Sequence, residues 1–415
     1  MTKPLSSHEK WLLRLRDRLR EERYHPGNAR QCVAVARNFL VFLELRRTVI
    51  GDAKPETVER YLTLARQRYR QRHGHLPDYE GWRGSHTNGI HMLLRMAQGQ
   101  WPPTPPAITR AAVYRRKLRE DFGVWLTEMR GLAAETVAER QEEACRFFDW
   151  LGERGIKGVA AIQVADLDAY MKHRAGVLRR ASIKGVATRL RSFLRWLHAT
   201  RQTARDLSVA VMAPVIYAVG SIPSALRSQD VHKILSIARQ DRTAKGLRDY
   251  AILVLLAKYG VRAGEITRLR LEDVDWRKEI LRVRHSKTGV TSYLPLLPEV
   301  GEAILNYLQK VRPRTSSREI FIRCRAPYQA FKNGSSLYTP IRHRIDAAEV
   351  PPGGKRGPHA FRHARAVSMI RASVTLKEIG DVLGHRSSDS ALAYLKLATE
   401  DLRAIALDIP VEVQR

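Results

Sequence analysis

The chain has 415 residues, and a hydrophobic content of 44% is enough for folded cores, which excludes a disordered chain and predicts two or three domains. Lysine and arginine number 73 against 42 aspartates and glutamates, so the net charge is +31. Such an excess predicts a polyanionic partner, with nucleic acid ahead of an anionic membrane or the ribosome, because the basic residues are spread along the whole chain.

The cysteines and the apolar stretches exclude further classes. Cys32, Cys145 and Cys324 lie too far apart in sequence to indicate a disulfide framework or a zinc module. The N-terminus carries charges through every turn, which is unlike a secretory signal, and no apolar stretch approaches the length of a membrane span. We therefore expect a cytoplasmic, nucleoid-associated protein without a membrane partner.

Two N-terminal stretches, 11–48 and 119–156, have similar patterns of apolar residues at helical spacing. They end in the similar motifs Phe39-Leu-Val-Phe-Leu43 and Phe147-Phe-Asp-Trp-Leu151, and each has echoes downstream, Glu56–Tyr61 beside Ala165–Tyr170 and Met92–Met96 beside Ser192–Trp196. The pattern predicts a duplicated helical domain, with copies at 1–105 and 110–205. The alternative is a chance likeness between two amphipathic helical bundles.

Two proline-containing joints divide the chain. The first, Trp101–Pro106, cannot be helical and separates the two helical units. The second lies in a linker at 206–227, where Pro214, Gly220 and Pro223 break the periodicity. Ser228 or Asp230 is then placed to cap a new helix.

The segment 228–415 mixes helices with a hairpin. We expect a helix over Leu247–Tyr259 that ends at Gly260, and strands over 279–284 and 291–296 joined by a turn at 285–289. A less regular stretch follows, to about Lys355. Further helices are predicted from His359, from Thr375 to Gly384, and from Ser388 or Asp389 through Tyr394. The predicted fold class is mainly α with a small β-sheet, and this segment is an α+β domain.

Cations and imidazoles follow the structural breaks of this segment. They are Arg262 after Gly260, Lys287 at the hairpin tip, His359 and Arg362 after Pro358, and His385 after Gly384, with Tyr394 nine residues further on. Planar guanidinium groups bind phosphate oxygens bidentately and stay charged, so Arg262 and Arg362 are candidates for a phosphate clamp. His359 and Arg362 are three residues apart, near a helix N-terminus that also favours an anion.

These motifs resemble the tyrosine recombinase (phage integrase) family. The resemblance rests on Tyr259-Gly-Val-Arg-Ala-Gly-Glu-Ile266, Ser286-Lys-Thr-Gly289, His359-Ala-Phe-Arg-His363, Leu383-Gly-His385 and Ala393-Tyr394, in this order. It extends over about residues 115–405, where 119–200 looks like the family's core-binding domain, a SAM-like DNA-binding fold, and the remainder from 228 like its catalytic domain. Residues 1–105 match the family weakly.

The resemblance implies a site-specific recombinase or integrase that cleaves and rejoins double-stranded DNA through a 3′-phosphotyrosyl bond. Tyr394 would be the nucleophile, Lys287 the acid that protonates the leaving 5′ oxygen, and His359 the proton acceptor, while His385 would hydrogen-bond the phosphate. The resemblance also implies a homo-tetramer on two DNA sites, with Leu395–Arg415 packing on a neighbouring subunit or on its own core. Neither a metal ion nor any other cofactor is expected.

Three alternatives stay open. A relaxing topoisomerase uses similar chemistry, and an accessory DNA-binding protein would carry the same motifs without activity. His359 and His363 have the spacing of a helical metal pair, although the glutamate of a zinc protease is absent between them. The chain also departs from the family at Ala372, Ser390 and Ala391, positions that affect helix ending and packing more than charge.

Overall fold

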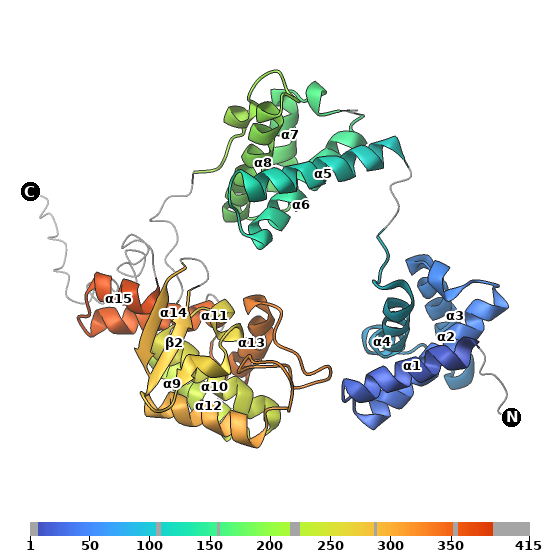
Figure 1. Ribbon diagram of the computed structural model, residues 1–415. Coiled ribbons are helices and arrows are strands. Elements are labelled where there is room, and N and C mark those ends of the chain that lie inside the picture. The colour runs from blue at the N-terminus through green and yellow to red at the C-terminus, as the bar shows by residue number, and fades with distance from the viewer. Residues whose placement is uncertain are drawn as a thin grey trace, which may run out of the picture. The chain divides into compact units, whose positions relative to one another are not determined.

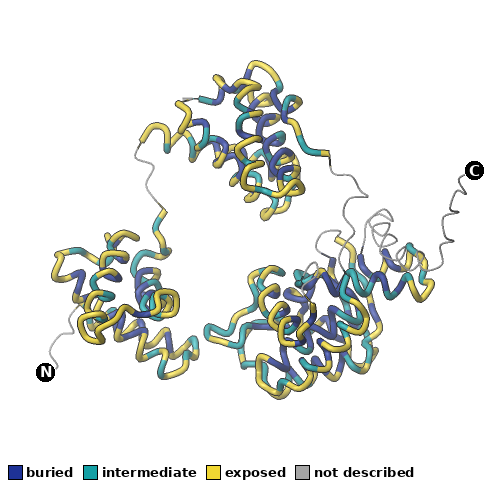
Figure 2. Tube along the Cα trace, turned by 180° about the vertical axis from the view of Figure 1, so that it is seen from behind, coloured by how far each residue is buried: buried dark blue, intermediate teal, exposed yellow. Residues whose placement is uncertain are grey.

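The computed structural model of the protein describes residues 7–104, 109–155, 158–215, 225–285, 289–351 and 356–384. Helices dominate this part of the chain, and a three-stranded sheet lies near its C-terminal end (Figure 1). The predicted fold class is thus confirmed. Buried apolar side chains form clusters that each stay within one of three stretches, the first helical module (7–104), the second helical module (109–215) and the C-terminal region (225–384) (Figure 2).

The first helical module contains four α-helices and one 3₁₀ turn. They are α1 (Ser7–Glu21), α2 (Pro26–Leu45), η1 (Ile50–Asp52), α3 (Pro55–His73) and α4 (Tyr79–Gln98). Pro26 and Pro55 begin helices, where a missing N–H costs nothing, and Gly74 ends α3 in the left-handed conformation with φ of 77°. In the core, the rings of Phe39 and Phe42 lie 5.3 and 5.5 Å from the ring of Tyr61.

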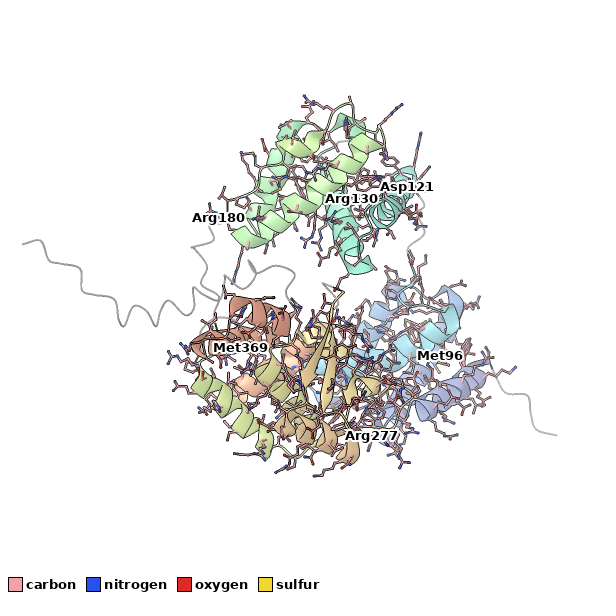
Figure 3. The ribbon with its side chains drawn as sticks, turned by 60° about the vertical axis from the view of Figure 1, so that its left-hand side comes forward. Met96, Asp121, Arg130, Arg180, Arg277 and Met369 are labelled. Carbon is pink, nitrogen blue, oxygen red and sulfur yellow. The ribbon has the colours of Figure 1, made fainter. Side chains whose placement is uncertain are left out.

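The second helical module has the same order of elements, followed by one more turn. They are α5 (Arg110–Glu128), α6 (Ala134–Glu153), η2 (Val159–Ala161), α7 (Val164–Ala175), α8 (Arg180–Ala199) and η3 (Leu207–Ala210). Phe147 and Trp150 of α6 lie 4.9 and 5.3 Å from the ring of Tyr170 on α7. The Tyr170 hydroxyl donates a hydrogen bond of 2.6 Å to the buried Glu143 carboxylate. Arg180 extends from the start of α8 into solvent (Figure 3), whereas the guanidinium of Arg130 lies 5.8 Å from the ring of Trp125.

The C-terminal region is built around one buried helix. Its helices are α9 (Ser228–Gln240), α10 (Ala244–Tyr259), α11 (Ala263–Thr267), η5 (Leu271–Asp273), α12 (Pro298–Lys310), η6 (Gly334–Leu337), α13 (Tyr338–Ala347), α14 (Pro358–Arg371) and α15 (Leu376–Leu383). Helix α10 contacts α9, α12 and α14, and its residues from Ala251 to Leu256 are buried on every side. As predicted, α10 ends at Gly260, which adopts a φ of 65°.

The predicted hairpin is confirmed. Strands β1 (Val274–Asp275), β2 (Ile280–Arg284) and β3 (Thr291–Pro295) form an antiparallel sheet in the order β1-β2-β3. Arg284 pairs with Thr291 at the end of the ladder next to the turn. Within that turn, residues 286–288 lie outside the described part of the chain.

Two sequence predictions were wrong. The stretch before Lys355 is not irregular, because it contains α12 and α13. Helix α12 begins with proline at its first position and buries Val300, Ile304 and Tyr307 on one face, a helical spacing that the sequence already contained. Helix α9 begins at Ser228, but Arg227 occupies its N-cap position and makes no side-chain capping bond. No helix that the structure describes is long and apolar enough to cross a membrane.

Candidate active site

Arg262 lies where the chain changes direction between α10 and α11. Gly260 allows the left-handed turn, and any side chain there would press on Leu383 and Arg365. Arg262 is then the N-cap of α11, and its side chain is only 18% exposed. One terminal nitrogen donates to Glu265 at 2.9 Å and the other to the Gly384 carbonyl oxygen at 3.3 Å. These bonds fix the direction of the cation.

Glu265 connects Arg262 to the hairpin. Its carboxylate accepts the Arg262 backbone N–H at 2.7 Å and, on the other oxygen, the Nδ1–H of His285 at 2.9 Å. Burial opposes ionisation of Glu265, yet the hydrogen bonds from His285 and Arg262 outweigh it and hold the pKa of the carboxyl below its usual value. Glu265 thus closes the first turn of α11, and it also positions a cation and an imidazole.

His285 was not identified from the sequence. Its ring is fully buried, and Nε2 lies 2.9 Å from the hydroxyl of Ser292 on β3. A Cβ at Gly384 would overlap this ring, so the end of α15 packs directly against it. In the sequence it stands directly after Arg284, which is exposed, and directly before Ser286-Lys287, and this position gives no local signal of its burial.

Arg362 is buried on the second turn of α14, with 3% of the residue exposed. One terminal nitrogen donates to the Gly260 carbonyl oxygen at 2.8 Å, and the other donates to the Leu383 carbonyl oxygen at 2.7 Å. Arg262 and Arg362 therefore bind the carbonyls of two consecutive residues, Leu383 and Gly384. The structure brings the two predicted clamp residues together at the end of α15.

His359 lies one helical turn before Arg362 and is exposed. Its ring centroid is 6.3 Å from that of His363, so the predicted i, i+4 pair does share one face of α14. Among the residues that the structure describes, no group of three or more metal-ligating side chains surrounds such a pair.

The described residues thus include half of the predicted catalytic set. Lys287, His385 and Tyr394 lie outside the described part of the chain. Their sequence neighbours are described, because His285 precedes Lys287 by two residues and Gly384 precedes His385 directly. Both neighbours belong to the hydrogen-bonded and packed group around Arg262.

The arrangement is suited to an anion. Two guanidinium groups and an exposed imidazole gather near the N-terminus of α14, whose dipole favours negative charge. Backbone carbonyls and one buried carboxylate orient the cations, so little side-chain entropy is left to lose when a phosphate binds. Such a site can stabilise the charge that develops during attack on a phosphodiester.

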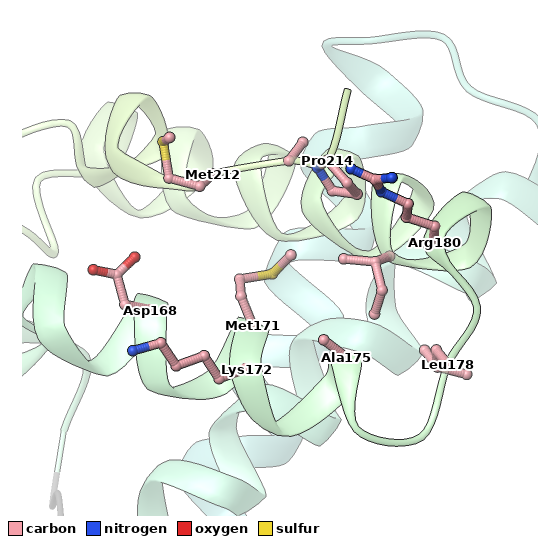
Figure 4. Close-up of a pocket in the computed structure, with 10 residues that line it drawn as sticks. Asp168, Met171, Lys172, Ala175, Leu178, Arg180, Met212 and Pro214 are labelled. Carbon is pink, nitrogen blue, oxygen red and sulfur yellow. The ribbon is translucent and has the colours of Figure 1, made fainter. Parts of the chain in front are cut away.

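A hollow on the second helical module does not carry this chemistry. It has a volume of about 560 Å³ and lies between α7, α8 and the chain at 212–214 (Figure 4). Met171, Leu178 and Met212 line it together with Lys172 and Arg180 at its rim. None of the predicted catalytic residues lines it.

Comparisons with known proteins agree with the geometry. Residues 224–401 match the phage integrase family. A Sinorhizobium fredii protein of the integrase/recombinase class, y4gC, is 56% identical over 189 residues, which are 46% of this chain and 97% of that protein. Tyrosine recombinase XerC 2 of Ralstonia nicotianae is 28% identical over 290 residues, 66% of this chain and 80% of that protein.

Solved structures show a similar fold. A lambda integrase fragment (residues 75–356), bound as a dimer to a COC′ core site, matches with a TM-score of 0.52 at 18% identity and covers 72% of this chain and 99% of that one. XerH site-specific recombinase bound to palindromic difH substrate matches with a TM-score of 0.55 at 15% identity, covering 71% and 87%.

Proposed function

This chain belongs to the phage integrase family of tyrosine recombinases, enzymes of site-specific DNA cleavage and rejoining, and we propose that Tyr394 is its nucleophile. The observation that carries the proposal is the pairing of Arg262 and Arg362 on the consecutive carbonyls of Leu383 and Gly384. In the sequence, His385 directly follows these two residues, and Tyr394 follows His385 by nine. The substrate is DNA.

In the proposed reaction the arginines neutralise the scissile phosphate. Arg262 and Arg362 contact the non-bridging oxygens and stabilise the additional charge of the transition state. The Tyr394 oxygen forms a bond to phosphorus while the bond from phosphorus to the 5′ oxygen breaks, which leaves a 3′-phosphotyrosyl link. His359 accepts the phenol proton, and His385 hydrogen-bonds the phosphate.

Lys287 is proposed to protonate the departing 5′ oxygen. A lysine among several cations gives up its proton more readily, and in the sequence Lys287 follows the buried His285 by two residues. The covalent link conserves the energy of the broken phosphodiester, so a 5′ hydroxyl of another strand can attack it and reverse the step without ATP. The mechanism assigns no role to a metal ion or other cofactor.

The domain roles follow from the same proposal. Residues 228–415 would form the catalytic domain, 110–205 the core-binding domain, 206–227 their linker, and 1–105 a further helical domain. A lambda integrase tetramer on a Holliday junction shares the fold, with a TM-score of 0.52 at 18% identity, which supports a homo-tetramer on paired sites here. We place the protein at the nucleoid because its substrate is DNA.

The test is covalent capture on a nicked duplex. DNA from the ends that flank the gene carries a nick near the cleavage point, so that the short fragment with the free 5′ hydroxyl dissociates and religation fails. Wild type and Tyr394→Phe are incubated with it in EDTA and run on a denaturing gel. A protease-sensitive shifted band for wild type alone is expected.

Other outcomes separate the alternatives. Tight binding to this DNA without any adduct would overturn the catalytic proposal in favour of an accessory DNA-binding protein. Relaxation of any supercoiled plasmid, with no requirement for a particular site, would indicate a topoisomerase. An adduct that persists in Tyr394→Phe would assign the nucleophile elsewhere.

A further inference from the structure

The two helical modules repeat each other residue by residue. Buried side chains of α2 recur in α6 at a spacing of 108, and those of α3 recur in α7 at a spacing of 109. The matching buried pairs are Ala36 and Ala144, Phe39 and Phe147, Leu43 and Leu151, Val58 and Leu167, Tyr61 and Tyr170, and Leu62 and Met171. The 3₁₀ turns η1 and η2 occupy the same place in this order.

The C-terminal end of the second helix also matches in detail between the two modules. Arg46 follows α2 and lies over the Phe42 ring at 5.0 Å, and Arg154 follows α6 and lies over the Trp150 ring at 4.8 Å. The next residue has a positive φ in both cases, 51° at Arg47 and 77° at Gly155. A chance likeness of two bundles would not reproduce the turn as well as the core.

One element departs from the repeat. Helix α3 has 19 residues and α7 has 12, and because their N-terminal parts match, the additional turns lie at the C-terminal end of α3. We call residues 66–75 the basic extension. It contains Arg66, Arg68, Arg70, Arg72, His73 and His75, and no acidic residue occurs from Arg60 to Pro77.

Among the described residues, no acidic side chain neutralises the exposed arginines of the basic extension. Arg68, Arg70 and Arg72 are exposed, and no ion pair is found for them among the residues that the structure describes. Other arginines of the same module do pair, as Arg18 does with Glu22 and Arg83 with Glu59. Cations near a helix C-terminus stabilise the helix dipole, but this effect falls off within the last turn and does not account for two turns of arginine.

The spacing and the rings of the basic extension fit a nucleic acid backbone. Arg68 and Arg72 are one turn apart, about 6 Å along the helix axis, close to two phosphate steps of one DNA strand, about 6.8 Å. Tyr69 supports the exposed end of the helix, because its ring lies 4.3 Å from the ring of His73 and 5.8 Å from that of His75. The extension is thus an ordered cationic surface and not a loose tail.

We propose that the basic extension binds the phosphates of duplex DNA outside the segment cleaved by the active site, as the contact surface of a second copy of the core-binding module. The proposal rests on the proposed function in one respect, since that function makes DNA the polyanion that this protein meets. It assigns the contact to the last two turns of α3, which α7 of the second helical module lacks.

The experiment measures duplex binding by the full-length protein against salt. Fluorescence anisotropy on a long labelled duplex compares wild type with the triple variant Arg68→Gln, Arg70→Gln, Arg72→Gln. Each lost phosphate contact lowers the slope of log affinity against log salt by about 0.9, so a reduction of about 2 is expected from Arg68 and Arg72, which share one face of the helix. A triple Arg→Lys variant at the same positions retains charge and should keep the wild-type slope.

A matched control removes the same charge from α1. The variant Lys10→Gln, Arg14→Gln, Arg18→Gln should keep the wild-type slope, because the proposal gives these residues no phosphate contact. Long-range attraction alone would instead weaken both Gln variants equally. Equal slopes for the two Gln triples, or no change in the α3 triple, would overturn the proposal. On a short nicked duplex the α3 triple should still form the covalent adduct, so failure of the cleavage chemistry is read out separately.

Discussion

The C-terminal region and the two helical modules treat charge in opposite ways. Among the described residues, the modules bury a single charged side chain, Glu143, whereas the C-terminal region buries Arg248, Asp249, Glu265, Asp273, His285 and Arg362. The modules are held together by repeated aromatic contacts, and their many arginines point to solvent. The same basic composition therefore supports two different designs.

The apolar cores of the modules serve stability, whereas the buried charges of the C-terminal region serve function. Taking an ion out of water costs several kcal/mol, and a buried pair is often no more stable than an apolar replacement. Buried charges are therefore expected where a position matters more than stability. In this chain Glu265, His285 and Arg362 lie around the two cations assigned to the phosphate, whereas Arg248 with Asp249 and Asp273 with Arg282 and Arg284 form separate ion pairs. The predictions below change one of these two designs at a time.

The largest effect is expected for Arg362→Ala. This change removes a proposed phosphate ligand and also the bonds that join Gly260 to Leu383. The rate of covalent adduct formation should fall about 10³-fold or more, as for other cations that stabilise phosphoryl transfer. Single-turnover cleavage of the nicked duplex measures it.

The control for this test is Arg277→Ala, which removes an exposed arginine of the same region (Figure 3). Its cleavage rate should match wild type. A rate for Arg362→Ala within tenfold of wild type would show that the buried cations are structural and that the active site lies elsewhere.

The next largest effect is a loss of stability on equivalent core substitutions in the two modules. Phe39→Ala and Phe147→Ala each empty a fully buried aromatic position against the matching tyrosine, Tyr61 or Tyr170. Each should destabilise its own module by about 3–5 kcal/mol. Native-state hydrogen exchange on the full chain resolves the loss module by module, and the exposed Leu45→Ala is the control. Costs that differ widely between the two positions would argue against equivalent cores.

The sequence predicted the repeat, the hairpin and the cations at structural breaks because each has a local signal. Phe39 and Phe147 stand in similar motifs, and Gly260 and Gly384 occupy the left-handed positions that end helices. It did not predict His285, because nothing local distinguishes a buried histidine from one on a solvated hairpin. Its burial depends on Glu265, Ser292 and the end of α15, which meet only in the folded chain.

The helix α12 was missed for a different reason. Its apolar positions Val300, Ile304 and Tyr307 do have helical spacing, and Pro298 marks its start. The prolines and glycines that follow near Lys355 are typical of irregular structure. Tertiary packing against α10 confirms which signal was the stronger.

A smaller effect is expected at two corresponding positions where the second module has a charged pair and the first module has apolar residues. Val35 of α2 corresponds to Glu143 of α6, and Ala65 of α3 corresponds to Arg174 of α7, which bonds Glu143 at 3.3 Å. Val35→Glu should destabilise the first module by about 3 kcal/mol, because it buries a carboxylate without a cation. Adding Ala65→Arg should recover about 1–2 kcal/mol through the new pair. Additive losses in the double variant would contradict the equivalence of these positions.

The smallest effect is a pH dependence in the C-terminal region. Because the folded-state pKa of Glu265 is below its ordinary value near 4.5, its contribution to stability is present above that pH and is lost as the pH falls through the folded-state pKa. Glu265→Gln should remove this acid-dependent part, whereas Gln at the exposed Glu302 should not. Hydrogen exchange in α10 and α11 between neutral and acid pH measures the difference, and parallel acid profiles for wild type and Glu265→Gln would show that the carboxylate is not held ionised by Arg262 and His285.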